Sequence, residues 1–154
     1  MGDVQFNIAK GAVKTYFNNV DTGSPANSKI IVVPLEASGL VADATLIDYD
    51  DLNALLGGAS NEQSTMGRKT LTGSDVTVTV DDTNERLELS MPTAITWTAA
   101  TGNACGKLLF CYDPDSTTGT DADIIPLLAY SFDAIPDGSD IVVNDHANGL
   151  IRVT

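Results

Sequence analysis

Apolar residues near the N-terminus recur at steps of three and four, which predicts an amphipathic helix over residues 7–20. Asn7 stands at the start of this stretch, where its side chain is placed to cap the first turn. Turn-forming residues over 21–28 then end the helix. The apolar stripe that would face the core consists of Ile8, Ala12, Val13, Tyr16, Phe17 and Val20.

A buried strand and a short second helix are predicted next. Residues 29–37 are apolar and largely β-branched, and Pro34 inside them predicts an edge position or a bulge. Residues 48–59 open with aspartates, continue with leucines and end in glycines. Aspartates at the start of a helix are explained better by capping and the helix dipole than by a catalytic carboxylate cluster.

From about residue 70 onward, apolar and polar residues alternate, and this period of two predicts strands. A β-hairpin is expected around the turn at 81–84, with Val76, Val78, Val80, Leu87 and Leu89 on its inward face. Further strands are predicted over residues 94–98, 106–112, 123–132, 140–144 and 149–153. We therefore expect one domain over residues 1–154, α+β and mainly β, with an N-terminal helix and a short second helix packed on an antiparallel β-sandwich or barrel.

Length and composition allow a single core. The chain has 154 residues, 43% of them hydrophobic, and no apolar run reaches the roughly 18 residues that a membrane span needs. The first residues lack the basic and apolar blocks of a secretory signal, so we expect the protein to be made and to fold in the cytoplasm.

The formal charge of −13 is unevenly distributed. Residues 1–40 hold three basic and three acidic side chains, whereas residues 41–154 hold five basic and eighteen acidic ones. Phosphate groups of nucleic acids and anionic membrane surfaces would be repelled, so neither is expected as a partner. The near-neutral N-terminal part is better suited to docking than the acidic body.

The most acidic stretch is CYDPDSTTGTDAD, residues 111–123. Counted from Asp113 as the first ligand of an EF-hand loop, the glycine position holds Thr118 and the final glutamate position holds Ile124. The calcium pattern therefore fails at its two most demanding positions, although an irregular calcium site remains an alternative. The favoured interpretation is an exposed acidic loop over residues 113–123.

The remaining candidate chemistry is sparse. His146 is the single histidine and has no nucleophile motif with it, which predicts a surface histidine. Cys105 and Cys111 are six residues apart, and if the run from 105 to 111 is a strand, their Cα atoms lie too far apart for a disulfide. Two cysteines and one histidine are also too few ligands for a tetrahedral zinc site. Trp97 is interpreted as a core or interface anchor. No catalytic residue, metal ligand or cofactor-binding residue is predicted, and we expect a protein that is not an enzyme.

Several stretches, among them FNIAKGAVKTYFNNV, VTVDDTNERLELSMP and TWTAATGNACGKLLFCYDPDSTTGTDADIIPL, resemble small virion structural proteins of tailed bacteriophages. The resemblance extends over nearly the whole chain and brings no catalytic residues with it. It implies a non-enzymatic component of the virion, first of all a head decoration (cement) protein on the outer surface, bound to the major capsid protein. A tail, neck or fibre component is the alternative, and a host-surface binding module is the second alternative.

The resemblance also shapes the expected interface. Decoration proteins commonly sit as homotrimers on capsid shells, so a homotrimer is expected. Residues 1–6 are predicted to form a docking arm, in which Val4 and Phe6 would fill pockets on the partner. Trp97 would mark a contact on the β body instead. The alternative for the N-terminus is that residues 2–6 fray while the following helix packs on its own sheet.

Overall fold

The computed structural model describes residues 2–146 and 149–153, and it confirms an α+β fold that is mainly β. The helices are α1 (Val13–Thr22), α2 (Asp43–Leu46) and α3 (Leu52–Gly58), with short 3-10 helices η1 (Asn7–Ala9) and η2 (Asp121–Asp123). The strands are β1 (Val4–Gln5), β2 (Lys29–Glu36), β3 (Lys69–Leu71), β4 (Thr77–Asp81), β5 (Arg86–Ser90), β6 (Ile95–Trp97), β7 (Cys105–Asp113), β8 (Ile125–Ala134), β9 (Ile141–Val143) and β10 (Ile151–Val153).

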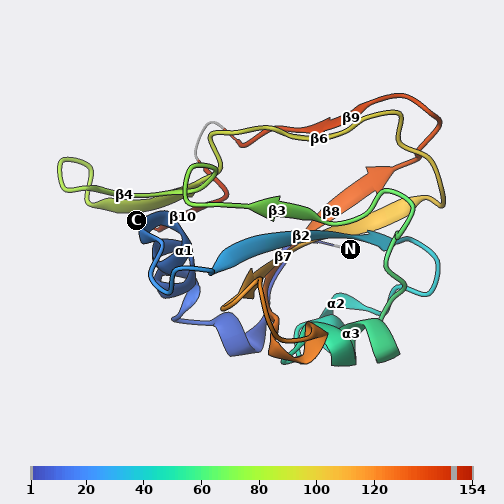
Figure 1. Ribbon diagram of the computed structural model, residues 1–154, viewed down its shortest axis with the longest axis horizontal. Coiled ribbons are helices and arrows are strands. Elements are labelled where there is room, and N and C mark those ends of the chain that lie inside the picture. Colours follow the sequence, from blue (N-terminus) through green and yellow to red (C-terminus); the bar gives the residue numbers. More distant parts are fainter. Residues whose placement is uncertain (1, 147–148, 154) are drawn as a thin grey trace.

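The strands form three antiparallel sheets. The main sheet has the order β1-β8-β7-β2-β3, a second sheet has the order β10-β5-β4, and β6 pairs with β9 as a two-stranded ribbon. Figure 1 shows the β6–β9 ribbon on one side of the main sheet and helices α2 and α3 on the other. No sheet in the described part of the chain closes on itself. Of the two predicted arrangements, the β-sandwich or the barrel, the barrel is therefore excluded.

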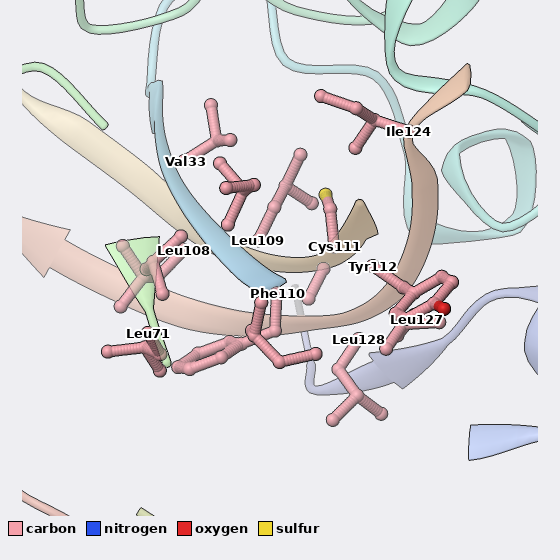
Figure 2. Packing of buried hydrophobic residues seen from close by; sticks show 14 of the residues in the cluster. Val33, Leu71, Leu108, Leu109, Phe110, Cys111, Tyr112, Ile124, Leu127 and Leu128 are labelled. Atoms are coloured by element: carbon pink, nitrogen blue, oxygen red, sulfur yellow. The ribbon is translucent and has the colours of Figure 1, made fainter. Parts of the chain in front are cut away.

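The core lies on both faces of strand β7, in which all nine residues are buried. Because side chains alternate along a strand, its neighbours divide into two sets. Figure 2 shows these sets on opposite sides of the sheet. Val33, Leu109 and Cys111 point with Ile124 to the side of α3, whereas Leu71, Leu108, Phe110 and Leu128 point to the other side.

The predicted helix over 7–20 is wrong in its first half. Residues 7–9 form only the 3-10 turn η1, and α1 begins at Val13. Gly11 between them has φ +81°, a left-handed conformation that interrupts any continuous helix. Asn7 therefore does not cap α1, and Ile8 is exposed instead of facing the core. The second half is confirmed: Phe17 and Val20 are buried, and Gly23 ends the helix with φ +65°.

Pro34 lies in an interior strand but at a local edge. β3 pairs with β2 only from Ile30 to Val32, so the ladder on that side has ended before Pro34. The carbonyl of Pro34 accepts from the Gln63 N–H on the same side (2.9 Å). The missing N–H therefore costs no ladder hydrogen bond, and the expected bulge occurs one position later, between Leu35 and Glu36.

The other predicted elements are confirmed, with small shifts at their ends. Asp51 caps α3 by accepting from the Ala54 N–H (2.7 Å). The hairpin of β4 and β5, residues 77–90, forms as predicted, but Val80 is 59% exposed because the hairpin extends beyond the body (Figure 1). Strands β1 and β3 and helix α2 were not predicted.

Candidate functional site

The N-terminal segment belongs to the fold and is not a free docking arm. Val4 and Gln5 form β1, which pairs with Ala129 and Leu128 on the outer edge of β8. Phe6 has no exposed surface. The expectation that Val4 and Phe6 insert into a partner is therefore wrong for Phe6, whose ring is already in the protein's own core, and Val4 is half-buried against the same core. Met1 lies outside the described residues.

The buried ammonium of Lys107 binds the backbone at the start of this segment. Lys107 lies in β7 with no exposed side-chain surface, and its Nζ donates to the Gly2 carbonyl (2.6 Å). The same ammonium lies 3.0 Å from Asp43 Oδ1 in an ion pair, and the other Asp43 oxygen accepts from the Gly2 N–H (2.7 Å). The Gly2 hydrogen bond and Lys107 hold the pKa of Asp43 below its usual value. This contact links Gly2, just before β1, to α2 and to β7.

Trp97 is a core residue. It is 2% exposed, its Nε1 donates to the Gly67 carbonyl (2.9 Å), and its ring lies 6.3 Å from that of Phe132. Lys69 Nζ lies 5.7 Å from the centre of the indole and covers it in a cation–π contact. Trp97 therefore joins the β6–β9 ribbon to the main sheet, which is the core alternative of its interpretation as a core or interface anchor.

The acidic loop is ordered by its own aspartates. Asp115 accepts from the Thr117 N–H (3.1 Å) and from the hydroxyls of Thr117 (2.6 Å) and Thr118 (2.8 Å), which lowers the pKa of Asp115 to about 2. Thr120 and Asp123 form a capping box at η2. Residues 116–120 are exposed, as predicted, whereas Asp113 at the end of β7 is buried.

The Asp121 side chain forms an ion pair with a residue outside the loop. Arg68 contacts Asp121 at 2.6 Å and Glu62 at 2.8 Å, so one guanidinium neutralises two carboxylates. Within residues 2–146 and 149–153, no group of three or more His, Cys, Asp or Glu side chains is arranged to hold a metal ion.

The two cysteines are buried free thiols in β7. Burial raises the pKa of both, so neither has the thiolate character of a nucleophile. His146 is exposed, as predicted. Among the described helices, none is long and apolar enough to cross a membrane.

A cavity that the sequence did not predict lies beside β8. This β8 cavity has a volume of about 410 Å³ and lies between the main sheet and the segment that follows β9. Its walls are aromatic and acidic: Phe110, Tyr130 and Phe132 come from the sheet, and Asp3 and Asp145 come from segments at either end of the chain. No local sequence pattern indicates it, because residues from four distant segments meet there.

Hydrogen bonds fix the acidic groups of the β8 cavity. Asp3 Oδ1 accepts from the Ser131 N–H (2.9 Å), while Asp145 accepts from the N–H groups of Met91 (2.7 Å) and His146 (2.9 Å). Tyr130 donates its hydroxyl to the Leu150 carbonyl (2.6 Å). Burial, with Asp3 and Asp145 nearby, raises the pKa of Tyr130, so the phenol stays neutral.

Comparisons of the chain with protein-family models, with curated proteins and with solved structures find no match.

Proposed function

We propose that this protein is a non-enzymatic virion structural protein, and that it decorates the head by binding the major capsid protein. The observation that carries the proposal is the hairpin of β4 and β5, which projects from a closed, well-packed body (Figure 1). The resemblance to virion structural proteins agrees with it. A hairpin that projects from the body is placed to contact a neighbouring protein.

The hairpin presents an open strand edge. Val78 in β4 donates its N–H away from β5, to Asp21 Oδ2 of α1 (3.1 Å). Because the direction of backbone groups repeats every second residue, the N–H and carbonyl of Val80 face the same outer side, beyond the reach of α1. The Val80 side chain is 59% exposed as well. An extended segment of the capsid protein could pair with this edge and cover Val80.

The surface charge supports a protein partner over a nucleic acid. Of the eight basic side chains, Arg68, Arg86, Lys107 and Arg152 are each paired with carboxylates of the same chain. The twenty-one acidic side chains exceed what the basic ones neutralise. Many identical weak contacts on a repetitive shell would then supply the total affinity. A homotrimer remains part of the proposal through the resemblance alone.

The test is addition of purified protein to undecorated shells, with sedimentation of the shells to measure occupancy. We expect the native protein to co-sediment and Val80→Asp to lose most of its occupancy. Val142→Asp is the matched control, because Val142 is 51% exposed on β9, away from the hairpin. Absence of binding by the native protein would contradict head decoration. Equal binding by both variants would place the contact elsewhere on the body.

A further inference from the structure

The β8 cavity has the composition of a site for an organic cation. Aromatic rings present negatively polarised faces, and carboxylates supply full negative charge, so the two together attract an ammonium group that carries an apolar stem. Both are present here, in Tyr130 and Phe132 on one side and in Asp3 and Asp145 on the other. No Lys or Arg is among the described lining residues.

Contacts within the chain orient several of the described wall residues. The rings of Phe110 and Tyr130 meet edge to face with centroids 5.7 Å apart, and the Tyr130 hydroxyl is held by Leu150. Each carboxylate is oriented by backbone N–H groups, which bind only part of its accepting capacity. Side chains that are already oriented lose little conformational entropy when a ligand binds to them.

Lys107 cannot neutralise the carboxylates of the cavity. It follows from the alternation along β7 that Lys107 points to the opposite face from Leu108 and Phe110, which line the cavity. Its ammonium is engaged by Gly2 and Asp43 on that other face. This ammonium is thus directed away from the cavity, and the one basic side chain among the described lining residues is His146.

We infer that the β8 cavity binds an alkylammonium group, with the aliphatic stem against Tyr130 and Phe132 and the ammonium between Asp3 and Asp145. A volume of about 410 Å³ is within the usual range for small-ligand sites and exceeds what a short alkylamine needs. The same chemistry is offered by a free amine and by a lysine side chain of a partner. This inference goes beyond the proposed function and does not depend on it.

The experiment is an NMR titration of the native protein at about pH 8, above the range in which histidines ordinarily titrate. The probes are n-butylammonium chloride and the neutral analogue 1-butanol, with NaCl at equal ionic strength as the blank. We expect saturable shifts at Ser131 and Tyr130 with butylammonium and much weaker binding of 1-butanol. Equal binding of the two probes, or no saturable shift with butylammonium, would overturn the inference.

Two variants test whether the charge of Asp3 contributes to butylammonium binding. Asp3→Asn keeps the acceptor for the Ser131 N–H and removes the charge, so butylammonium should bind at least about three-fold more weakly. Asp82→Asn, on the exposed hairpin turn, changes the net charge equally and should leave binding unchanged. Equal weakening in both variants would overturn the assignment of the ammonium to this cavity.

Nα-acetyl-lysine methylamide distinguishes the two sources of the ammonium group. Binding comparable to that of butylammonium supports a lysine side chain of a protein, and binding of butylammonium alone supports a free amine.

Discussion

At the scale of single residues, Lys107 illustrates how a buried charge is retained in an apolar strand. The ammonium has no exposed surface, and its compensation comes from Asp43 and the Gly2 carbonyl. Removing the partner of a buried charge costs more than replacing the charge by an apolar side chain of similar length. The two partners of this ion pair are therefore expected to respond differently to substitution.

We predict that Asp43→Ala lowers the free energy of unfolding by about 2 kcal/mol or more, because Lys107 would be left buried without a counterion. Lys107→Met should cost less, since Asp43 is partly exposed and keeps the Gly2 N–H. Urea denaturation at pH 7 measures both. Asp50→Ala, at an exposed neighbouring aspartate, is the control for the change in charge. An Asp43→Ala variant as stable as Asp50→Ala would contradict this account of the ion pair.

Asp113 is an aspartate whose pKa is raised by its surroundings, so its charge makes the stability of the fold depend on pH. Burial and the nearby Asp115, Asp123 and Asp121 raise its pKa. The folded protein therefore binds this proton more tightly than the unfolded chain does, so the ionised carboxylate destabilises the fold at neutral pH. The penalty is relieved as the pH falls through the raised pKa.

Asp113→Asn should accordingly raise the free energy of unfolding at pH 7, by less than about 1 kcal/mol because its neighbours are exposed and screened. The amide oxygen can still accept from the Asp115 N–H, which lies 3.0 Å from Oδ1 in the native protein. The gain should vanish when urea denaturation is repeated at a pH below about 3.5, where a normal aspartate is protonated. A variant less stable than the native protein at pH 7 would show that the charge is favourable.

At the scale of elements, strands with a clear period of two were predictable and short pairings were not. The hairpin, β7 and β8 carry enough alternating or continuous apolar residues to be recognised locally. β1 and β3 have two and three residues, and they form only because β8 and β2 offer them an edge. The break at Gly11 depends on its left-handed conformation, which the helical spacing of its neighbours conceals.

The same reasoning explains the misplaced interface residues. Val4 and Phe6 look like a terminal apolar segment with no core to join, because their partners in β8 lie more than a hundred residues further along the chain. The β8 cavity is hidden from sequence reasoning for a similar reason, since Asp3 and Asp145 come together only through the sheet. Local patterns reveal elements, whereas contacts between distant segments decide which side chains remain available.

The N-terminal segment should therefore contribute to the stability of the fold. Phe6→Ala removes a fully buried ring and should lower the free energy of unfolding by about 3–4 kcal/mol. Ile8→Ala, two residues away at an exposed position, should cost less than about 1 kcal/mol. Thermal and urea unfolding followed by circular dichroism would measure both. Small effects of similar size for both substitutions would contradict the burial of Phe6 in the core and would support a free docking arm.

At the scale of the whole molecule, a closed body with a net charge of −13 carries one projecting hairpin (Figure 1). The core residues of the main sheet, the β6–β9 ribbon and α1 to α3 form one continuous cluster, which leaves no second domain within the described residues. Such a body is suited to repeated placement on a regular lattice, where avidity compensates for a small contact on each subunit.

The number of copies of this protein in each purified virion tests head decoration most directly. Quantitative mass spectrometry against the major capsid protein would give that ratio. Decoration of a shell requires copies in proportion to capsid subunits, so we expect hundreds per particle, on the order of the number of lattice positions. A count of a few to a few tens per particle would contradict head decoration and assign the protein to the neck or tail.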